Sequence, residues 1–189
     1  MIEYSEIIRD DLGEVIALYE KYLNSGEYIE RSMRKAFDSE EYIGYKACDN
    51  GRIVGFFCGQ KEIEFTYPHP ELEKEIRYFA GNRKLYTPDG LLILDEYRKH
   101  GIAGELIRRM KKCLLEKQIE LALVELWIYP DGTIPARTPL KDIGEAVYEK
   151  RISMFYSRLR EYGITCPICG AECKCGALIQ LLEVKETQD

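Results

Sequence analysis

The most informative stretch of the sequence is Leu91-Leu-Ile-Leu-Asp-Glu-Tyr-Arg98-Lys-His-Gly101-Ile-Ala-Gly104, in which an apolar run passes into a glycine-bearing turn. Four consecutive apolar residues predict a buried central strand, and the apolar spacing after the turn predicts a helix to about Lys117. Such a turn offers unpaired backbone N–H groups and the positive end of a helix dipole to a phosphate. Glycines let the backbone approach a pyrophosphate, and Arg98 and Lys99 add positive charge.

Apolar periodicity outside this stretch predicts strands alternating with helices. Asn50-Gly51 between two strand-like runs predicts a tight hairpin. Strands are expected at 2–9, 42–48, 52–59, 91–94, 121–129 and 177–184, and helices from 12, at 29–37, 71–79, 102–117 and 142–162. The expected fold class is α/β (α+β), a mixed, mostly antiparallel sheet flanked by helices, in the order β-α-α-β-β-(α)-β-α-β-α-β-β.

Length and composition limit the class of protein. The 189 residues are 46% hydrophobic and 32% charged, which favours a single globular domain over residues 1–189 and excludes a disordered chain or a membrane protein. The first residues lack the basic and apolar regions of a signal peptide, so a cytoplasmic location is expected. The net charge of −6 disfavours nucleic acid as a partner.

Three segments resemble the GNAT superfamily of acetyl-CoA-dependent acyltransferases. Arg98-Lys-His-Gly101-Ile-Ala103 is similar to the family's Arg/Gln-x-x-Gly-x-Gly/Ala motif, Gly51-Arg-Ile-Val-Gly55 to its Gly-x-Ile-Val-Gly hairpin, and Ser153-Met-Phe-Tyr156 with Glu161-Tyr-Gly163 to its Phe-Tyr…Gly-Phe segment. The likeness covers most of residues 1–164 in the family's order. This chain departs from the pattern in lacking the usual Asn after the fifth strand. Its insertion at 130–141 and its long 61–89 stretch are expected to border the acceptor site.

The resemblance implies direct attack of an amine on the thioester of acetyl-CoA. It implies that Tyr156 protonates the departing thiolate, for which a tyrosine is suited because it is protonated at neutral pH; the other interpretation is that Tyr156 only covers a helix face. A carboxylate must accept the amine proton, and Asp89 is ranked before Glu62, Glu64 and Glu125. The residues expected to contact acetyl-CoA are Leu92, Ile93, Leu94, Arg98, Lys99, His100, Gly101, Ile102, Ala103 and Gly104.

Four of the seven cysteines fall within ten residues, and the ordinary GNAT pattern does not predict them. Zn²⁺ takes four tetrahedral thiolates in structural sites, so a structural zinc ion inside a C-terminal hairpin is expected. An iron–sulfur cluster and a redox disulfide are the alternatives. The expected metal ligands are Cys166, Cys169, Cys173 and Cys175.

The sequence therefore predicts an acetyl-CoA-dependent N-acetyltransferase acting on a small-molecule or protein amine. The alternative is a non-catalytic acyl-CoA sensor or a zinc-knuckle interaction module, because fold resemblance does not prove turnover. A nucleic-acid-binding knuckle is disfavoured, since Lys174 is the one basic residue between Cys166 and Gly176. No membrane partner is expected, and the oligomeric state stays open, a homodimer included.

Overall fold

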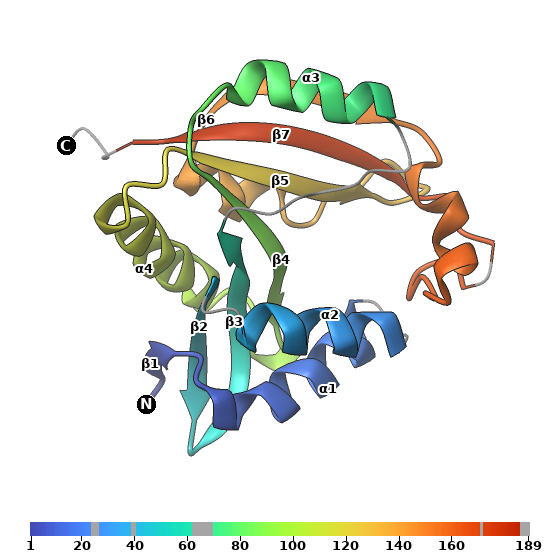
Figure 1. Ribbon diagram of the computed structural model, residues 1–189. Coiled ribbons are helices and arrows are strands. Elements are labelled where there is room, and N and C mark those ends of the chain that lie inside the picture. Colours follow the sequence, from blue (N-terminus) through green and yellow to red (C-terminus); the bar gives the residue numbers. More distant parts are fainter. Residues whose placement is uncertain (24–26, 39–40, 62–69, 171, 186–189) are drawn as a thin grey trace.

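The computed structural model describes residues 1–23, 27–38, 41–61, 70–170 and 172–185. Its strands form one seven-stranded sheet in the order β1-β2-β3-β4-β5-β7-β6 (Figure 1). All neighbouring strands run antiparallel except β4 and β5, which are parallel. The strands are β1 (Glu3–Glu6), β2 (Tyr42–Asp49), β3 (Arg52–Lys61), β4 (Leu85–Ile93), β5 (Leu121–Ile128), β6 (Gly144–Ile152) and β7 (Gly176–Val184). The predicted mixed, mostly antiparallel architecture is confirmed.

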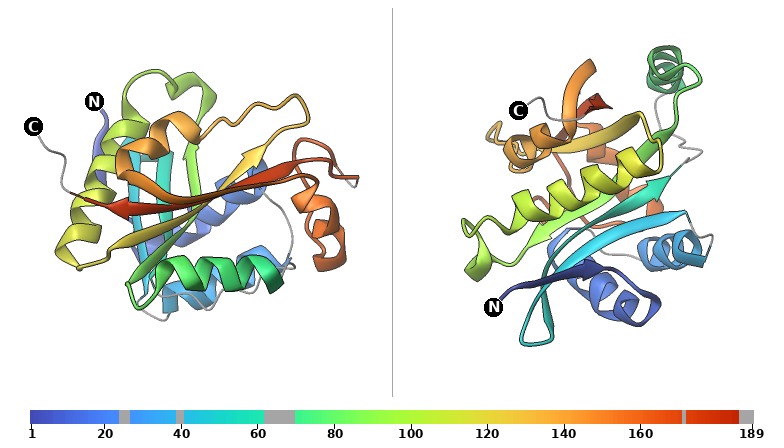
Figure 2. Two further views of the ribbon diagram at one scale, coloured as in Figure 1. Left: turned by 90° about the horizontal axis from the view of Figure 1, so that it is seen from above. Right: turned by 90° about the vertical axis from the view of Figure 1, so that its left-hand side faces the viewer.

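Helices cover both faces of the sheet (Figure 2). Helix α4 and the short α5 lie on one face, and α1, α2 and α3 lie on the other. The helical segments are α1 (Leu12–Tyr22), α2 (Glu27–Asp38), α3 (Pro70–Ala80), α4 (Ile102–Glu116) and α5 (Arg137–Leu140), with single turns η1 (Arg9–Asp11), η2 (Asp95–Tyr97) and η3 (Lys141–Ile143) and the longer 3₁₀ segment η4 (Phe155–Tyr162). In the part of the chain that the structure describes, no helix has the length and apolar character needed to span a membrane.

The central strand β5 is buried on both faces, as its continuous apolar sequence predicts. Ala122, Val124 and Leu126 pack toward α4. Leu121 and Leu123 pack on the opposite face, in a second buried cluster with α3. Residues that alternate along β5 therefore belong to different cores, and the face opposite α4 is the one on which α1, α3 and η4 also pack.

The hairpin between β2 and β3 forms where the sequence predicts it. Asn50 and Gly51 both have positive φ, at 50° and 81°, as the two central residues of a type I′ turn require. The strand after this turn, β3, pairs with β4, against which Gly55 packs so closely that an added Cβ would lie 3.0 Å from the carbonyl oxygen of Leu92. The glycine in this motif therefore lets β3 and β4 pair beside α4.

The predicted helix over 142–162 is wrong. Residues 144–152 form the edge strand β6, which pairs antiparallel with β7, and the helical parts of the range are the end of η3 and the segment η4 (Phe155–Tyr162). The spacing of Val147, Tyr148, Ile152 and Phe155 imitates a helical face, but pairing with β7 satisfies the backbone of this segment instead. Its many charged residues suit an exposed edge strand.

The insertion at 130–141 starts directly after β5, and its later part packs against the core that α4 shares with the sheet. Leu140 and the adjacent Ile143 are buried in the core that α4 shares with the sheet. The end of this insertion therefore packs on α4, on the face of the sheet opposite Tyr156.

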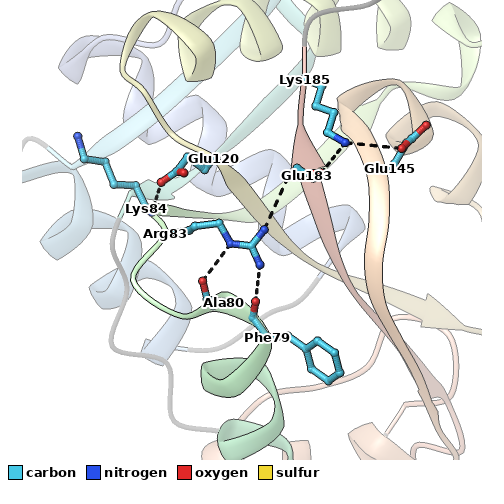
Figure 3. A network of polar contacts seen from close by, with 8 residues as sticks. All are labelled: Phe79, Ala80, Arg83, Lys84, Glu120, Glu145, Glu183 and Lys185. Atoms are coloured by element: carbon cyan, nitrogen blue, oxygen red, sulfur yellow. Dashed lines mark hydrogen bonds and ion pairs between the residues drawn. The ribbon is translucent and has the colours of Figure 1, made fainter.

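A polar network fixes β4 to β5 where the two strands begin (Figure 3). The backbone N–H of Glu120 donates to the carbonyl of Lys84 at 3.1 Å, and the Glu120 carboxylate accepts from the N–H of Lys84 at 3.3 Å. Arg83 lies 3.8 Å from Glu183 of β7, which also pairs with Lys185 at 2.6 Å. Such exposed pairs each stabilise by about 0–1 kcal/mol, so the main effect of the network is to set the relative position of the strands.

Candidate active site

Beyond that junction, β4 and β5 diverge. They pair only at Leu85–Leu121 and Tyr86–Ala122, while β4 stays paired with β3 to Ile93 and β5 with β7 over its whole length. Figure 1 shows the two strands separating from their common end. The β5-facing edge of Leu92–Leu94 consequently has no strand partner among the described residues. A backbone edge of this kind can hydrogen-bond an extended ligand.

The predicted phosphate-binding loop lies at the far end of β4, where α4 begins. Gly101 has φ of 79° and precedes the helix, whose first backbone bond is Glu105 N–H to Gly101 carbonyl at 3.1 Å. No described contact uses the N–H groups of Ile102, Ala103 and Gly104. A Cβ added at Gly101 or Gly104 would enter open space. The loop thus presents free N–H donors at the positive end of a helix dipole, which suits a phosphate group.

The side chains of this loop differ in their roles. Ile102 is buried and anchors the start of α4, whereas Arg98, Lys99 and His100 are exposed. Arg98 is held in place, because its Nε donates to the carbonyl of Ile93 at 3.2 Å and its guanidinium pairs with Asp95 at 2.8 Å. Lys99 and His100 are therefore the cationic or polar side chains most accessible to a ligand.

Negative charge near the loop is neutralised by α4 itself. Glu105 in the first turn pairs with Arg108 at 2.7 Å and Arg109 at 2.6 Å, and the hydrogen bonds from Arg108 hold the pKa of the Glu105 carboxyl below its usual value. The Glu105 carboxylate is directed toward these arginines, so it opposes a bound anion less than an unpaired carboxylate would.

Tyr156 lies on η4 with its side chain buried against the face of the sheet opposite α4. Its hydroxyl donates to the carboxylate of Glu125 on β5 at 2.6 Å. The aromatic rings of Phe155 and Trp127 lie edge-on to it, with centroids 5.0 and 5.5 Å away. Tyr156 is therefore held at a defined place beside the diverging strands, next to a carboxylate.

Asp89 lies in a different part of the same face. A bulge in β4 makes it the extra residue between Pro88 and Gly90, which pair with Gly59 and Cys58. Its carboxylate accepts from Gln60 Nε2 at 3.2 Å, and its backbone carbonyl accepts from the Tyr19 hydroxyl of α1 at 3.2 Å. Burial raises the pKa of Asp89 to about 6, against the opposing effect of the Gln60 hydrogen bond.

Of the four carboxylates named from the sequence, the structure brings Glu125 to Tyr156. Glu62 and Glu64 lie outside the described residues. Sequence reasoning ranked Glu125 behind Asp89 and missed Trp127. Part of the signal was present in the sequence of β5, because alternation places Leu123, Glu125 and Trp127 on one face of the strand. The contact with Tyr156 could not be predicted in this way, because Tyr156 lies 31 residues after Glu125 and reaches it only through the tertiary fold.

The four clustered cysteines lie in the connection between β6 and β7, and their sulfur atoms are all within 4.8 Å of one another. Cys169 Sγ is 3.5 Å and Cys166 Sγ is 4.0 Å from Cys175 Sγ. A tetrahedral ion with Zn–S bonds of about 2.3 Å requires sulfur–sulfur separations of about 3.8 Å, whereas a disulfide requires about 2.05 Å. The geometry suits four ligands around one ion.

The local backbone supports this arrangement. Cys166-Pro-Ile-Cys169-Gly170 makes a tight turn in which the N–H of Gly170 donates to the carbonyl of Cys166 at 2.9 Å and Gly170 has φ of 69°. The N–H of Lys174 donates to Cys169 Sγ at 3.5 Å. Three of the cysteines are buried and Cys169 is half-buried, so the group is closed to large ligands.

Comparison with known proteins agrees with the fold. The model of the Acetyltransferase (GNAT) family matches residues 7–137. Arabidopsis thaliana NAA60 in complex with a bisubstrate analogue is 16% identical with a TM-score of 0.68, over 99% of this chain and 100% of that one. The ribosomal-protein-S18-alanine N-acetyltransferase of Escherichia coli is 13% identical with a TM-score of 0.64, over 100% and 97%. The NatC complex bound to Gag peptide and CoA is 16% identical with a TM-score of 0.67, over 97% and 99%.

No curated protein matches this sequence significantly. The family model nevertheless spans more than half of the chain, and it includes both the diverging strands and the loop at the start of α4. The chain belongs to the GNAT family of acetyltransferases.

Proposed function

We propose that this protein is an N-acetyltransferase that transfers the acetyl group of acetyl-CoA directly to an amine in a ternary complex. The observation that carries the proposal is the proximity of two features along the chain, a backbone edge at Leu92–Leu94 that has no strand partner on its β5 side and the free N–H groups at the start of α4. The first suits the pantetheine arm of acetyl-CoA and the second suits its pyrophosphate. The thioester then lies between the diverging strands, within reach of the face that carries Tyr156.

The chemistry follows from the contact between Tyr156 and Glu125. The amine nitrogen attacks the thioester carbonyl carbon, the C–S bond breaks, and the Tyr156 hydroxyl gives its proton to the CoA sulfur. Glu125 accepts the proton that leaves the nitrogen and returns it to Tyr156 across their 2.6 Å hydrogen bond. One proton thus passes from amine to thiol, and both side chains end in their starting states.

Asp89 remains the second candidate for the base. Its pKa of about 6 suits proton acceptance near neutral pH, and it occupies a bulge in β4 on the same face as Tyr156. Glu125 is preferred because its carboxylate directly contacts the proposed acid.

The acceptor class is a primary amine, and a peptide N-terminus is the first to test. One structural neighbour is named as an alanine N-acetyltransferase of a ribosomal protein, and another is described as bound to a peptide and CoA. The acidic chain also does not repel a cationic small amine.

The proposal includes a structural zinc ion at Cys166, Cys169, Cys173 and Cys175, within a single domain over residues 1–189. Sulfur–sulfur distances of 3.5 and 4.0 Å, with all four sulfur atoms within 4.8 Å of one another, support one shared ion over a polynuclear iron–sulfur cluster, because cysteines on different irons lie further apart. Four cysteines leave no open ligand position, so the ion has no direct part in the chemistry.

The test is release of the CoA thiol from acetyl-CoA in the presence of peptides and small amines. Wild-type protein is expected to turn over at least one amine. Tyr156→Phe is expected to lower kcat about 10²-fold or more while its Kd for acetyl-CoA stays within twofold. The matched control is Tyr78→Phe, because Tyr78 is 82% exposed on α3.

Unchanged turnover in Tyr156→Phe would contradict the acid role. Tight acetyl-CoA binding by wild-type protein, with no turnover of any amine, would instead favour the sensor alternative.

A further inference from the structure

The cysteine cluster is connected to Tyr156 by two kinds of contact. The backbone N–H of Tyr156 donates to the carbonyl of Cys175 at 3.3 Å. Phe155 and Tyr156 also belong to the same buried cluster as Cys166, Cys173 and Cys175. The residue proposed as the general acid is therefore hydrogen-bonded to the backbone of Cys175 and lies in the same buried cluster as three of the four cysteines.

The segment that carries Tyr156 has little regular structure of its own. Residues 153–175, between β6 and β7, contain no strand and no α-helix in their described part, only the 3₁₀ segment η4. Hydrogen bonds in 3₁₀ helices have poorer geometry than those in α-helices. Long loops also lose more entropy on ordering than short ones. A cross-link from Cys166 to Cys175 would divide this connection and fix η4 against β7.

The proposed acetyl-CoA loop depends on different contacts. Ile102 and Leu106 of α4 belong to the core on the opposite face of the sheet, with which the cluster around the cysteines shares no member. Loosening of the cysteine cluster is therefore expected to move Tyr156 while leaving the loop at 98–104 in place.

We propose that metal binding by the four cysteines positions Tyr156 against Glu125, so that the metal controls the rate of acetyl transfer separately from acetyl-CoA binding. The cysteines act as positioning residues and do not touch the substrate. The inference rests on the proposed function for its effect on kcat, whereas the metal site and the movement of Tyr156 are measurable without turnover.

The protein contains its own reporter for this movement. Trp127 is the single tryptophan of the chain, and its ring lies 5.5 Å from that of Tyr156. Displacement of η4 would remove Tyr156 from Trp127 and admit water, which shifts tryptophan emission to longer wavelength. Trp127 emission therefore reports the position of η4 independently of catalysis.

The experiment compares zinc-loaded wild-type protein, wild-type protein stripped by a chelator under reducing conditions, and the variant Cys175→Ser. The matched control is Cys48→Ser, because Cys48 lies on β2 outside the cluster. Metal content is measured by mass spectrometry of the metals, acetyl-CoA affinity by calorimetry, and the position of η4 by Trp127 emission.

The expected results are one zinc per chain in wild-type protein and in Cys48→Ser. Stripped protein and Cys175→Ser should show red-shifted Trp127 emission, at least a tenfold lower kcat and a Kd for acetyl-CoA within twofold of the loaded protein. Added zinc should restore emission and kcat in stripped wild-type protein but not in Cys175→Ser.

Three outcomes would overturn the inference. The first is no stoichiometric metal after reconstitution, or two or more irons per chain. The second is unchanged Trp127 emission after stripping, and the third is loss of acetyl-CoA binding together with the metal, since the ion would then support the whole fold. If wild-type protein turns over no amine, the proposed function fails, while metal content and emission still decide whether the metal positions Tyr156.

Discussion

Two carboxylates compete for one catalytic role, and single substitutions separate them. Glu125→Gln keeps the shape of the side chain but cannot accept a proton, so kcat should fall about 10²-fold with an unchanged Kd for acetyl-CoA. Asp89→Asn should lower kcat less. Glu116→Gln serves as the control because Glu116 is exposed at the end of α4. A larger loss in Asp89→Asn, together with loss of a rate increase near pH 6, would identify Asp89 as the base.

Asp89 should also make stability depend on pH. Burial raises its pKa in the folded protein to about 6, above the value of about 4 for an ordinary aspartate. The folded state therefore holds a proton that the unfolded state has lost between about pH 4 and pH 6, and the free energy of unfolding should fall as pH rises through this window.

Asp89→Asn should remove this decrease of the unfolding free energy with rising pH, because asparagine does not titrate. Urea unfolding of both proteins between pH 4 and pH 8 measures the difference. If the free energy of unfolding changed equally with pH in wild type and variant, burial would not raise the pKa of the Asp89 carboxyl.

At the scale of elements, Gly55 sets how closely β3, β4 and α4 approach. A Cβ there would lie 2.7 Å from Ile93 Cδ1 and 3.0 Å from the Leu92 carbonyl oxygen, and only the isoleucine end can move easily. Gly55→Ala should destabilise the fold by about 1–3 kcal/mol, as overpacking does. Gly13→Ala on α1 is the control, because an added Cβ there meets nothing within 4 Å and alanine favours helix by about 1 kcal/mol. Similar urea midpoints for the two variants would refute this explanation of the glycine.

At the scale of the whole molecule, acetyl-CoA should stabilise the fold. At a concentration a hundredfold above Kd, mass action adds about 2.7 kcal/mol, which for a chain of this size raises Tm by roughly 5–11 °C. Gly101→Val should abolish this shift, because it fills the open space at the phosphate-binding loop.

Gly81→Val is the matched control for that experiment. Gly81 also has positive φ, at 60°, and open space around it, but it follows α3 rather than preceding α4. Both variants lose stability from backbone strain, so only the ligand-induced shift differs. A normal shift in Gly101→Val would contradict the placement of the pyrophosphate.

Local signals in the sequence predicted much of this fold. Asn50-Gly51 specified the hairpin, and the apolar run at 91–94 specified a central strand, because turn chemistry and burial act over a few residues. The strand β6 was missed because its apolar residues fit helical spacing equally well, and only pairing with β7 decides between the two.

In the candidate site, too, local features could be predicted from the sequence and contacts between distant segments could not. The loop at 98–104 is continuous in sequence, and its position between a central strand and a helix was predicted correctly. The pairing of Glu125 with Tyr156 joins β5 to a segment beyond the edge strand, so its existence follows from tertiary packing rather than from a motif.

The junction of β4 and β5 has a consequence for the backbone dynamics of the site. Their paired ends, Leu85–Leu121 and Tyr86–Ala122, are braced by Arg83, Lys84 and Glu120, whereas Leu92–Leu94 has a strand on one side only. Amide hydrogens of the free protein should therefore exchange with deuterium slowly at the braced end and faster toward Leu94. Occupation of the opening by acetyl-CoA should remove this gradient, so that the cofactor completes the sheet as an additional, non-peptide strand.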